Sequence, residues 1–502
     1  MQTMNISKLL SNQSPVQLNR IFFVLMLIIF QAGSIVIFAF FIRYDDMIYG
    51  STNVNLKDNI NAEFNLKISY SFYQNIGLMM LVGYSFLIAF LRFNRWNSLG
   101  MTLYTVCLGM QYYIIFMIFW QCLFLNKWGK EETIDFPILL KSQKGVIAVL
   151  ISLGALMGKI DYFQLLFLIV IELILYCLNE YLILNVFYTC DAGGGMMIHL
   201  FGGIFGASAS WVYSPKFNCK NNPNKLPSYS SGTIAFIGTL FLWIFFPVFN
   251  SSATQIPLLI TISATNTYLG LASSTLMAFT TSLFINRGKL NIEHILNAIL
   301  AGGIILGSCS EIIYYPYISI ILGGAAGIIS VLCFYFLNPL LEAIYLYDTR
   351  GVIHLHAIPG FLSGVVSACI CTAIGNYYPG NNQIIIKSIL KNNRNQYQQG
   401  AFQIISTLVS LGIGLGGILV GFVLRLWRIF DLPEDTFGDH IFWKMMLDVN
   451  SPIIHIPGGN IIPHIPTRSL PPIISSPRML NQQSAGMLNY PPYNILPGQT
   501  AR

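Results

Sequence analysis

Two histidines occupy matching places in two similar, strongly apolar stretches of the sequence. Each stretch has an aspartate, a glycine three residues later, the histidine five residues after that glycine, and another glycine four residues further on. The copies lie 157 residues apart and consist of Asp191, Gly194, His199 and Gly203, and of Asp348, Gly351, His356 and Gly360. A neutral imidazole both donates and accepts hydrogen bonds, and its pKa of about 6.5 lets small effects decide its protonation. Two such rings in contact could pass a proton, or bind a small donor, without holding a permanent charge.

A histidine in an apolar stretch also has a purely structural interpretation. For a single example, a neutral core side chain with a satisfied hydrogen bond explains the residue as well as a function does. Repetition of the whole pattern favours function for His199 and His356, whereas the neighbouring His354 is assigned no role. Asp191 and Asp348 are expected to cap helix N-termini, where a carboxylate accepts backbone N–H groups; attraction of a cation is the alternative.

The composition places these patterns in a membrane. Of 502 residues, 54% are hydrophobic and only 9% charged, against about 25% charged in ordinary soluble domains. This excludes a soluble globular protein. The net charge of +7 is scattered, which argues against nucleic-acid binding. The nine cysteines form no metal-ligand set and no phosphate-binding loop is present, so we expect no metal, no cofactor and no enzymatic activity.

Apolar stretches long enough to cross a bilayer predict the elements that carry the histidines. About twelve such helices are expected, at residues 21–42, 68–91, 96–126, 145–158, 162–188, 192–213, 232–250, 268–286, 295–310, 312–341, 352–374 and 400–424. Twelve crossings put both termini on one side, and the positive-inside rule makes that side cytoplasmic. We therefore predict an all-α polytopic membrane protein with cytoplasmic termini.

The positions of the two aspartates predict an inverted repeat. After the first helix, Asp191 opens the fifth of the remaining eleven and Asp348 opens the tenth, so the two copies enter the membrane from opposite faces. This is the arrangement of two inverted five-helix repeats, here with an extra first helix and a final long helix. Paired elements of such repeats meet near the midplane, which would bring His199 and His356 together.

Three regions follow from these patterns. Residues 1–20 form a cytoplasmic N-terminus, 21–430 the transmembrane domain, and 431–502 a Pro-rich tail that we expect to be disordered. The tail is interpreted as solubilising, with docking to a proline-reading domain as the alternative.

Several motifs resemble one known family in the same order. The stretches are DAGGGMMIHLFGGIFG from Asp191, FIGTLFLWIFFPVFNSS from Phe236, GKLNIEHILNAILAGG from Gly288 and DTRGVIHLHAIPG from Asp348. They resemble Rh-type proteins of the ammonium transporter (Amt/Rh) superfamily over residues 21–428. The resemblance implies a homotrimer in the plasma membrane, with one narrow hydrophobic pore through each subunit.

The resemblance also assigns residues. It implies that His199 and His356 are the twin pore histidines and that Phe249, beside Asn250, is the inner phenylalanine that blocks the pore. The family's acidic vestibule positions match Glu180 and Glu342. Structural pairing of both glutamates is the alternative.

One position departs from the family pattern. The outer gate phenylalanine aligns with Lys144, beside Gln143. A lysine at an outer mouth would repel ammonium unless an acid neutralises it, and Glu132 and Asp135 are the nearby candidates.

The function implied is transport of ammonium or ammonia across the membrane, with the ion deprotonated before conduction through the pore. The expected partners are this substrate, membrane lipid and further copies of the chain. A carbon dioxide channel is one alternative, and a non-conducting ammonium sensor or membrane scaffold is the other.

Overall fold

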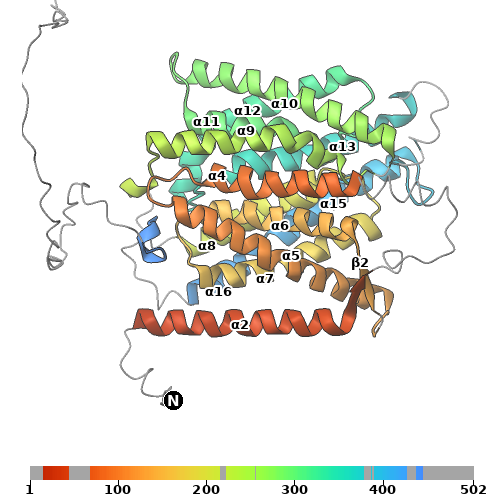
Figure 1. The fold of residues 1–502 in the computed structure, drawn as a ribbon. Helices are drawn as coiled ribbons and strands as arrows, with labels where there is room; N and C mark the ends of the chain where they lie inside the picture. Colours follow the sequence, from red (N-terminus) through yellow and green to blue (C-terminus); the bar gives the residue numbers. More distant parts are fainter. Residues whose placement is uncertain are drawn as a thin grey trace, which may run out of the picture. The chain divides into compact units, whose positions relative to one another are not determined.

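The computed structural model describes residues 15–44, 68–129, 131–214, 222–254, 256–377, 386, 389–426 and 437–444. In these residues eleven helices are long and apolar enough to cross a membrane, and a shorter apolar helix, α11, adds a twelfth. The packed helices of Figure 1 thus confirm the predicted all-α polytopic class.

The elements follow the expected order along the chain. They are α2 (Pro15–Phe41), β1 (Ile42–Tyr44), η2 (Met79–Tyr84), α4 (Ser85–Ile88), α5 (Arg95–Leu125), β2 (Glu132–Ile134), α6 (Phe136–Leu156), α7 (Tyr162–Tyr181), η3 (Leu182–Val186), η4 (Gly195–Leu200), α8 (Phe201–Tyr213), η5 (Pro223–Lys225), α9 (Tyr229–Ser251), α10 (Pro257–Ile285), α11 (Ile292–Ile305), α12 (Pro316–Ala343), η6 (Ile353–Ala357), α13 (Ile358–Tyr377), α15 (Gln396–Gly414), α16 (Gly417–Leu426) and η8 (Asp439–Ile441).

Helix α2 lies at the edge of the bundle, against α5 (Figure 1). Only 6% of its most apolar window is buried within the chain, although its mean hydropathy is the highest of all the spans. The Ser34 hydroxyl donates to Gln111 at 2.8 Å, and the Tyr112 hydroxyl donates to the Phe30 carbonyl at 2.9 Å. The extra first helix therefore leaves most of its apolar surface for lipid or another chain.

Helix α6 begins nine residues before the predicted start of its span. Asp135 accepts the backbone N–H of Ile138 and a proline occupies the first turn, both of which favour a helix start. Lys141 and Lys144 break the apolar run in the sequence, which is why the apolar pattern alone placed the start too late.

Helices α6 and α8 form the enclosed centre, with 83% of the most apolar window of each span buried. Their backbones touch at glycines: a Cβ added at Gly202 would lie 2.6 Å from the Ala148 carbonyl oxygen, and one at Gly206 2.5 Å from the Ser152 Cα. Small residues permit this approach where lipid provides no hydrophobic drive for helix association. The repeat that carries His199 is thereby fixed inside the bundle.

The chain returns to the bundle after α16. Within residues 437–444, Asp439 accepts hydrogen bonds from the backbone N–H groups of Trp96 at 3.0 Å and Asn97 at 2.7 Å. These groups lie in the first turn of α5, whose N–H groups have no partner within the helix. Burial raises the pKa of Asp439, and these backbone bonds oppose that rise.

The contact between residues 437–444 and the bundle was not expected from the sequence. Residues 437–444 lie within the region 431–502 that we expected to be disordered, and there Phe437 is buried against Gly158. The three aromatic residues of this segment, Phe437, Phe442 and Trp443, follow no regular spacing and gave too weak a signal in the sequence. The stretches 431–436 and 445–502 lie outside the described residues.

Candidate functional site

The two copies of the repeated pattern adopt the same local structure. Gly194 and Gly351 both have left-handed backbone angles, with φ of 68° and 69°, a region that favours glycine. A short π-helical turn follows each glycine, η4 before α8 and η6 before α13, and each turn carries one histidine of the pair. The duplication in the sequence is thus a duplication in backbone geometry.

The two aspartates lie at the start of these turns. Asp191 accepts the backbone N–H groups of Met196 at 3.2 Å and Met197 at 2.8 Å, and also the Ser308 hydroxyl at 2.6 Å. Asp348 accepts the N–H of Ile353 at 2.9 Å through one oxygen. A carboxylate at these places satisfies N–H groups that the helix leaves free.

The two histidine rings touch inside the bundle. The Nδ1 atoms of His199 and His356 are 3.1 Å apart, and the ring planes are inclined by only 10°. Both rings are buried. A hydrogen bond between two Nδ1 atoms requires that one carries a proton and the other accepts it, so the neutral pair holds a single proton between the rings. The Nε2 atoms are then left for other partners.

Glycines of the repeated pattern allow this contact. A Cβ at Gly203 would lie 2.7 Å from the backbone nitrogen of Ala357, and one at Gly360 would lie 2.7 Å from the nitrogen of Leu200. Each copy of the pattern therefore presses its last glycine against the other copy, next to the other histidine. The approach of the backbones fixes the separation of the rings.

Replacing Gly203 with valine should separate the two histidines. The new side chain meets backbone atoms, which cannot rotate away, and overpacking of this kind costs about 1–3 kcal/mol. We expect a lower unfolding temperature in detergent. Gly412, whose Cβ would meet nothing within 4 Å, is the matched control, and equal effects of Gly203→Val and Gly412→Val would contradict this account.

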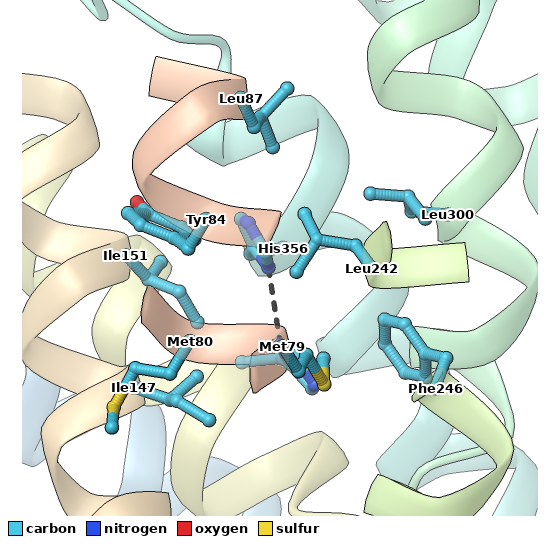
Figure 2. A pocket seen from close by; sticks show the side chains of 11 residues that line it. Met79, Met80, Tyr84, Leu87, Ile147, Ile151, Leu242, Phe246, Leu300 and His356 are labelled. Atoms are coloured by element: carbon cyan, nitrogen blue, oxygen red, sulfur yellow. Dashed lines mark hydrogen bonds between the residues drawn. The ribbon is translucent and has the colours of Figure 1, made fainter. Parts of the chain in front are cut away.

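A pocket adjoins the histidine pair, and Figure 2 shows its side chains around His356. Besides the two histidines, its walls are apolar apart from one tyrosine: Met79, Met80, Tyr84, Leu87, Ile147, Ile151, Leu242, Phe246 and Leu300. The Tyr84 hydroxyl donates to the Leu150 carbonyl, so it is already satisfied. The two imidazoles are therefore the remaining polar side chains in the lining of this pocket.

Two phenylalanines of α9 pack against His199. The Phe246 ring is stacked on it with centroids 5.8 Å apart, and the Phe249 ring meets it edge-on at the same separation. Asn250 donates to the Thr267 hydroxyl at 3.0 Å and to a backbone carbonyl of α11 at 2.9 Å. Asn250 thus anchors α9 and does not extend the line of rings.

Lys144 lies against the Phe249 ring of α9. Its Nζ is 5.2 Å from the centroid of the Phe249 ring and donates to the Ala192 carbonyl at 2.9 Å. The side chain is only 3% exposed. The lysine predicted at the outer gate position thus contacts the ring predicted to be the inner gate.

The acids suggested to neutralise Lys144 were the wrong ones. Asp135 caps α6 and Glu132 lies in β2, whereas Asp191, Glu180 and Glu311 are the carboxylates with electrostatic influence on the Lys144 ammonium group. Glu311 was hard to single out because it is one acid in an apolar loop; its carboxylate accepts the Thr254 hydroxyl at 2.7 Å.

The other predicted acids form local pairs. Glu180 of α7 accepts the Tyr113 hydroxyl at 2.5 Å, and Glu342 near the end of α12 lies 3.3 Å from the Lys225 ammonium group. The sequence reasoning did not single out Glu172, which is fully buried and accepts the Ser152 hydroxyl at 2.5 Å. A lone acid in an apolar helix was the available signal.

His354 faces away from the pair. Its ring meets the edge of Phe334 with centroids 5.3 Å apart, and that phenylalanine also contacts His294 at 5.4 Å. Among the described residues, no group of three histidine, cysteine or acidic side chains is placed to hold a metal ion.

Comparison with known proteins finds a matching family model and similar sequences. The model of the Ammonium Transporter Family matches residues 32–434. Ammonium transporter Rh type B of Oryzias latipes is 35% identical over 431 residues, covering 83% of this chain and 91% of the relative. Ammonium transporter Rh type C of Canis lupus familiaris is 32% identical, covering 88% and 97%.

Two solved structures have a fold similar to that of this chain. Rh50 of Nitrosomonas europaea, described as one of the Rhesus protein family of channels, has a TM-score of 0.62 at 26% identity and covers 79% of this chain and 94% of its own. A sensor Amt protein has a TM-score of 0.61 at 18% identity, covering 76% and 98%, and shows the likeness of fold alone. The relatives are named as transporters and channels, not as enzymes.

Proposed function

Because this chain belongs to the Ammonium Transporter Family, we propose that it carries ammonia along the contacting histidines after ammonium has lost its proton. The family supports transport of ammonium or ammonia, and the single observation that supports the histidine path is the 3.1 Å contact of His199 with His356 beside an apolar pocket. Neutral imidazoles accept and donate hydrogen bonds to ammonia without holding a charge.

The physical reason for carrying the neutral species is the cost of charge in an apolar site. Moving an isolated ion into low dielectric costs tens of kcal/mol by Born estimates, whereas a neutral polar molecule costs only a few. Sodium and potassium ions cannot release a proton to become neutral. A dry apolar passage therefore selects ammonia over these ions.

The order of contacts suggests a direction through the site. Phe249 is the inner gate, followed by His199, His356 and the apolar pocket. Asp191 and Asp348 hold the two turns that carry the histidines, and Glu180 and Glu342 lend negative charge nearer to the helix ends. Hydrophobic constrictions of this kind also hold back water by dewetting.

The assembly and location follow the family resemblance. We propose a homotrimer in the plasma membrane with both termini in the cytoplasm. The largely uncovered α2 leaves apolar surface for lipid or for a neighbouring subunit.

A non-conducting ammonium sensor is the second candidate. The observation that favours it is Lys144, a cation buried beside the proposed gate. A cation at this point repels ammonium, so a sensor would bind ammonium elsewhere and pass no ammonia to the pocket.

Liposomes distinguish the two functions. Vesicles containing the purified protein should show an internal pH change on addition of an ammonium salt that is at least several times faster than in empty vesicles. Entry of neutral ammonia binds internal protons, so the internal pH rises. Equal rates in loaded and empty vesicles would favour the sensor, and a matching acceleration by carbon dioxide would favour a general gas channel.

A further inference from the structure

Lys144 is a charged side chain in the interior of a membrane helix, which is costly unless the charge has specific partners. Its two contacts are a backbone carbonyl oxygen, that of Ala192 at 2.9 Å, and the face of Phe249, with the ring centroid 5.2 Å away. Both are groups that attract a compact ammonium ion, the first as an acceptor and the second through the negative charge of the ring face.

The end of this side chain has the same chemistry as the proposed substrate. A lysine terminates in a compact, strongly hydrated ammonium group with three N–H donors. The position beside Phe249 is thus occupied by an alkylammonium group that the chain itself supplies.

Three carboxylates favour a cation at this position. Asp191, Glu180 and Glu311 attract the Lys144 ammonium group, although burial opposes its charge. Asp191 already accepts two backbone N–H groups and the Ser308 hydroxyl. A second cation at the same ring would lie close to the first in a setting of low dielectric, where like charges repel strongly.

The occupied position leads directly to the histidines. The Phe249 ring contacts the Lys144 ammonium group and also meets His199 edge-on. His199 in turn contacts His356. The lysine is therefore connected to the histidine pair through a single aromatic ring.

We propose that Lys144 is a specificity-determining residue, whose tethered ammonium group holds the cation position at Phe249 so that only neutral ammonia passes this point. The inference rests on the proposed function, and it places the loss of the substrate's proton ahead of Lys144, in the region of Glu311. Flux through the protein then follows the concentration of ammonia and not that of ammonium.

The flux experiment varies ammonium at constant ammonia. Vesicles containing the protein receive ammonium salts at several pH values, with total concentration adjusted so that ammonia stays constant while ammonium changes about tenfold for each pH unit. Wild-type flux should remain constant within about twofold. Lys144→Met, which keeps the length of the side chain and removes its charge, should gain a component that rises with ammonium and carries electrical current.

Two variants control for charge and position. Lys141→Met removes an exposed lysine from the same helix and should behave like the wild type. Lys144→Arg keeps a cation and should show no ammonium-dependent component. Wild-type flux that rises with ammonium at constant ammonia would overturn the role of Lys144 while leaving transport itself established.

A binding measurement keeps the inference testable without flux. Methylammonium titrated into the purified protein in detergent should bind Lys144→Met at least tenfold more tightly than the wild type or Lys141→Met. Equal affinities in variants that elute as the wild type does would overturn the inference. A wild type that conducts no faster than empty vesicles would refute the proposed function, and the binding result would still decide whether Lys144 holds a cation position.

Discussion

Replacing His199 with alanine is expected to lower ammonia flux about 5- to 150-fold. A polar molecule that enters an apolar site without a hydrogen-bond partner loses about 1–3 kcal/mol, and each 1.4 kcal/mol corresponds to a factor of ten. The variant removes one ring and leaves the Nδ1 of His356 without its partner at 3.1 Å. Proteoliposome flux, measured as the internal pH change, provides the test.

The double variant examines whether the histidines act as a unit. Because each ring depends on the other for its proton and orientation, His199→Ala combined with His356→Ala should reduce flux little more than either single change. His294→Ala is the matched control, since His294 is buried on α11 and contacts Phe334 instead of the pair. Wild-type flux in both single variants, with unchanged elution from a sizing column, would make the pair purely structural.

The contact of the histidines could be predicted because the pattern that contains each of them occurs twice in the sequence. A duplicated pattern that enters the membrane from opposite faces has one simple geometric solution, in which the copies meet near the middle. The glycines of each copy indicate how the histidines are brought together. Gly194 and Gly351 adopt left-handed angles. Gly203 and Gly360 permit the close approach of the backbones. Local patterns thus encoded this long-range contact.

Contacts between segments without a repeat were not predictable in the same way. The acids near Lys144 were assigned by distance along the chain, whereas Asp191, Glu180 and Glu311 reach it from three other segments. Packing decides such pairings, and no spacing rule in one sequence records them. The docked segment 437–444 was missed for the same reason, since its three aromatic residues, Phe437, Phe442 and Trp443, follow no period that would reveal a buried face.

The start of α6 was predicted too late for a different reason. An apolar window marks where a helix meets lipid, and α6 has two lysines in its first three turns, the exposed Lys141 and the buried Lys144. The capping aspartate and the proline after it were better indicators of its boundary than hydropathy. Boundaries of interior membrane helices are therefore better sought in capping residues.

Replacing Phe249 with alanine is expected to open the site to water. The ring is fully buried between the Lys144 ammonium group and His199. Its removal leaves a space with a cation on one side and an imidazole on the other, and a space lined by polar groups holds water where an apolar one stays dry. Osmotic swelling of proteoliposomes should become several times faster than with the wild type.

The same change should remove the selection of the neutral species. Water beside His199 provides a path for protons and lowers the cost of a cation at this depth, so ammonium salts should drive an electrical current that the wild type does not carry. Loss of a large buried ring costs about 3–5 kcal/mol, so folding is checked by elution and thermal unfolding. Phe245→Ala, on the same helix but half-buried, is the matched control. The prediction fails if the variant folds and both water permeability and current stay at wild-type levels. The aromatic contact between Lys144 and the histidines would then be dispensable for keeping the passage dry, and the barrier to water would lie elsewhere.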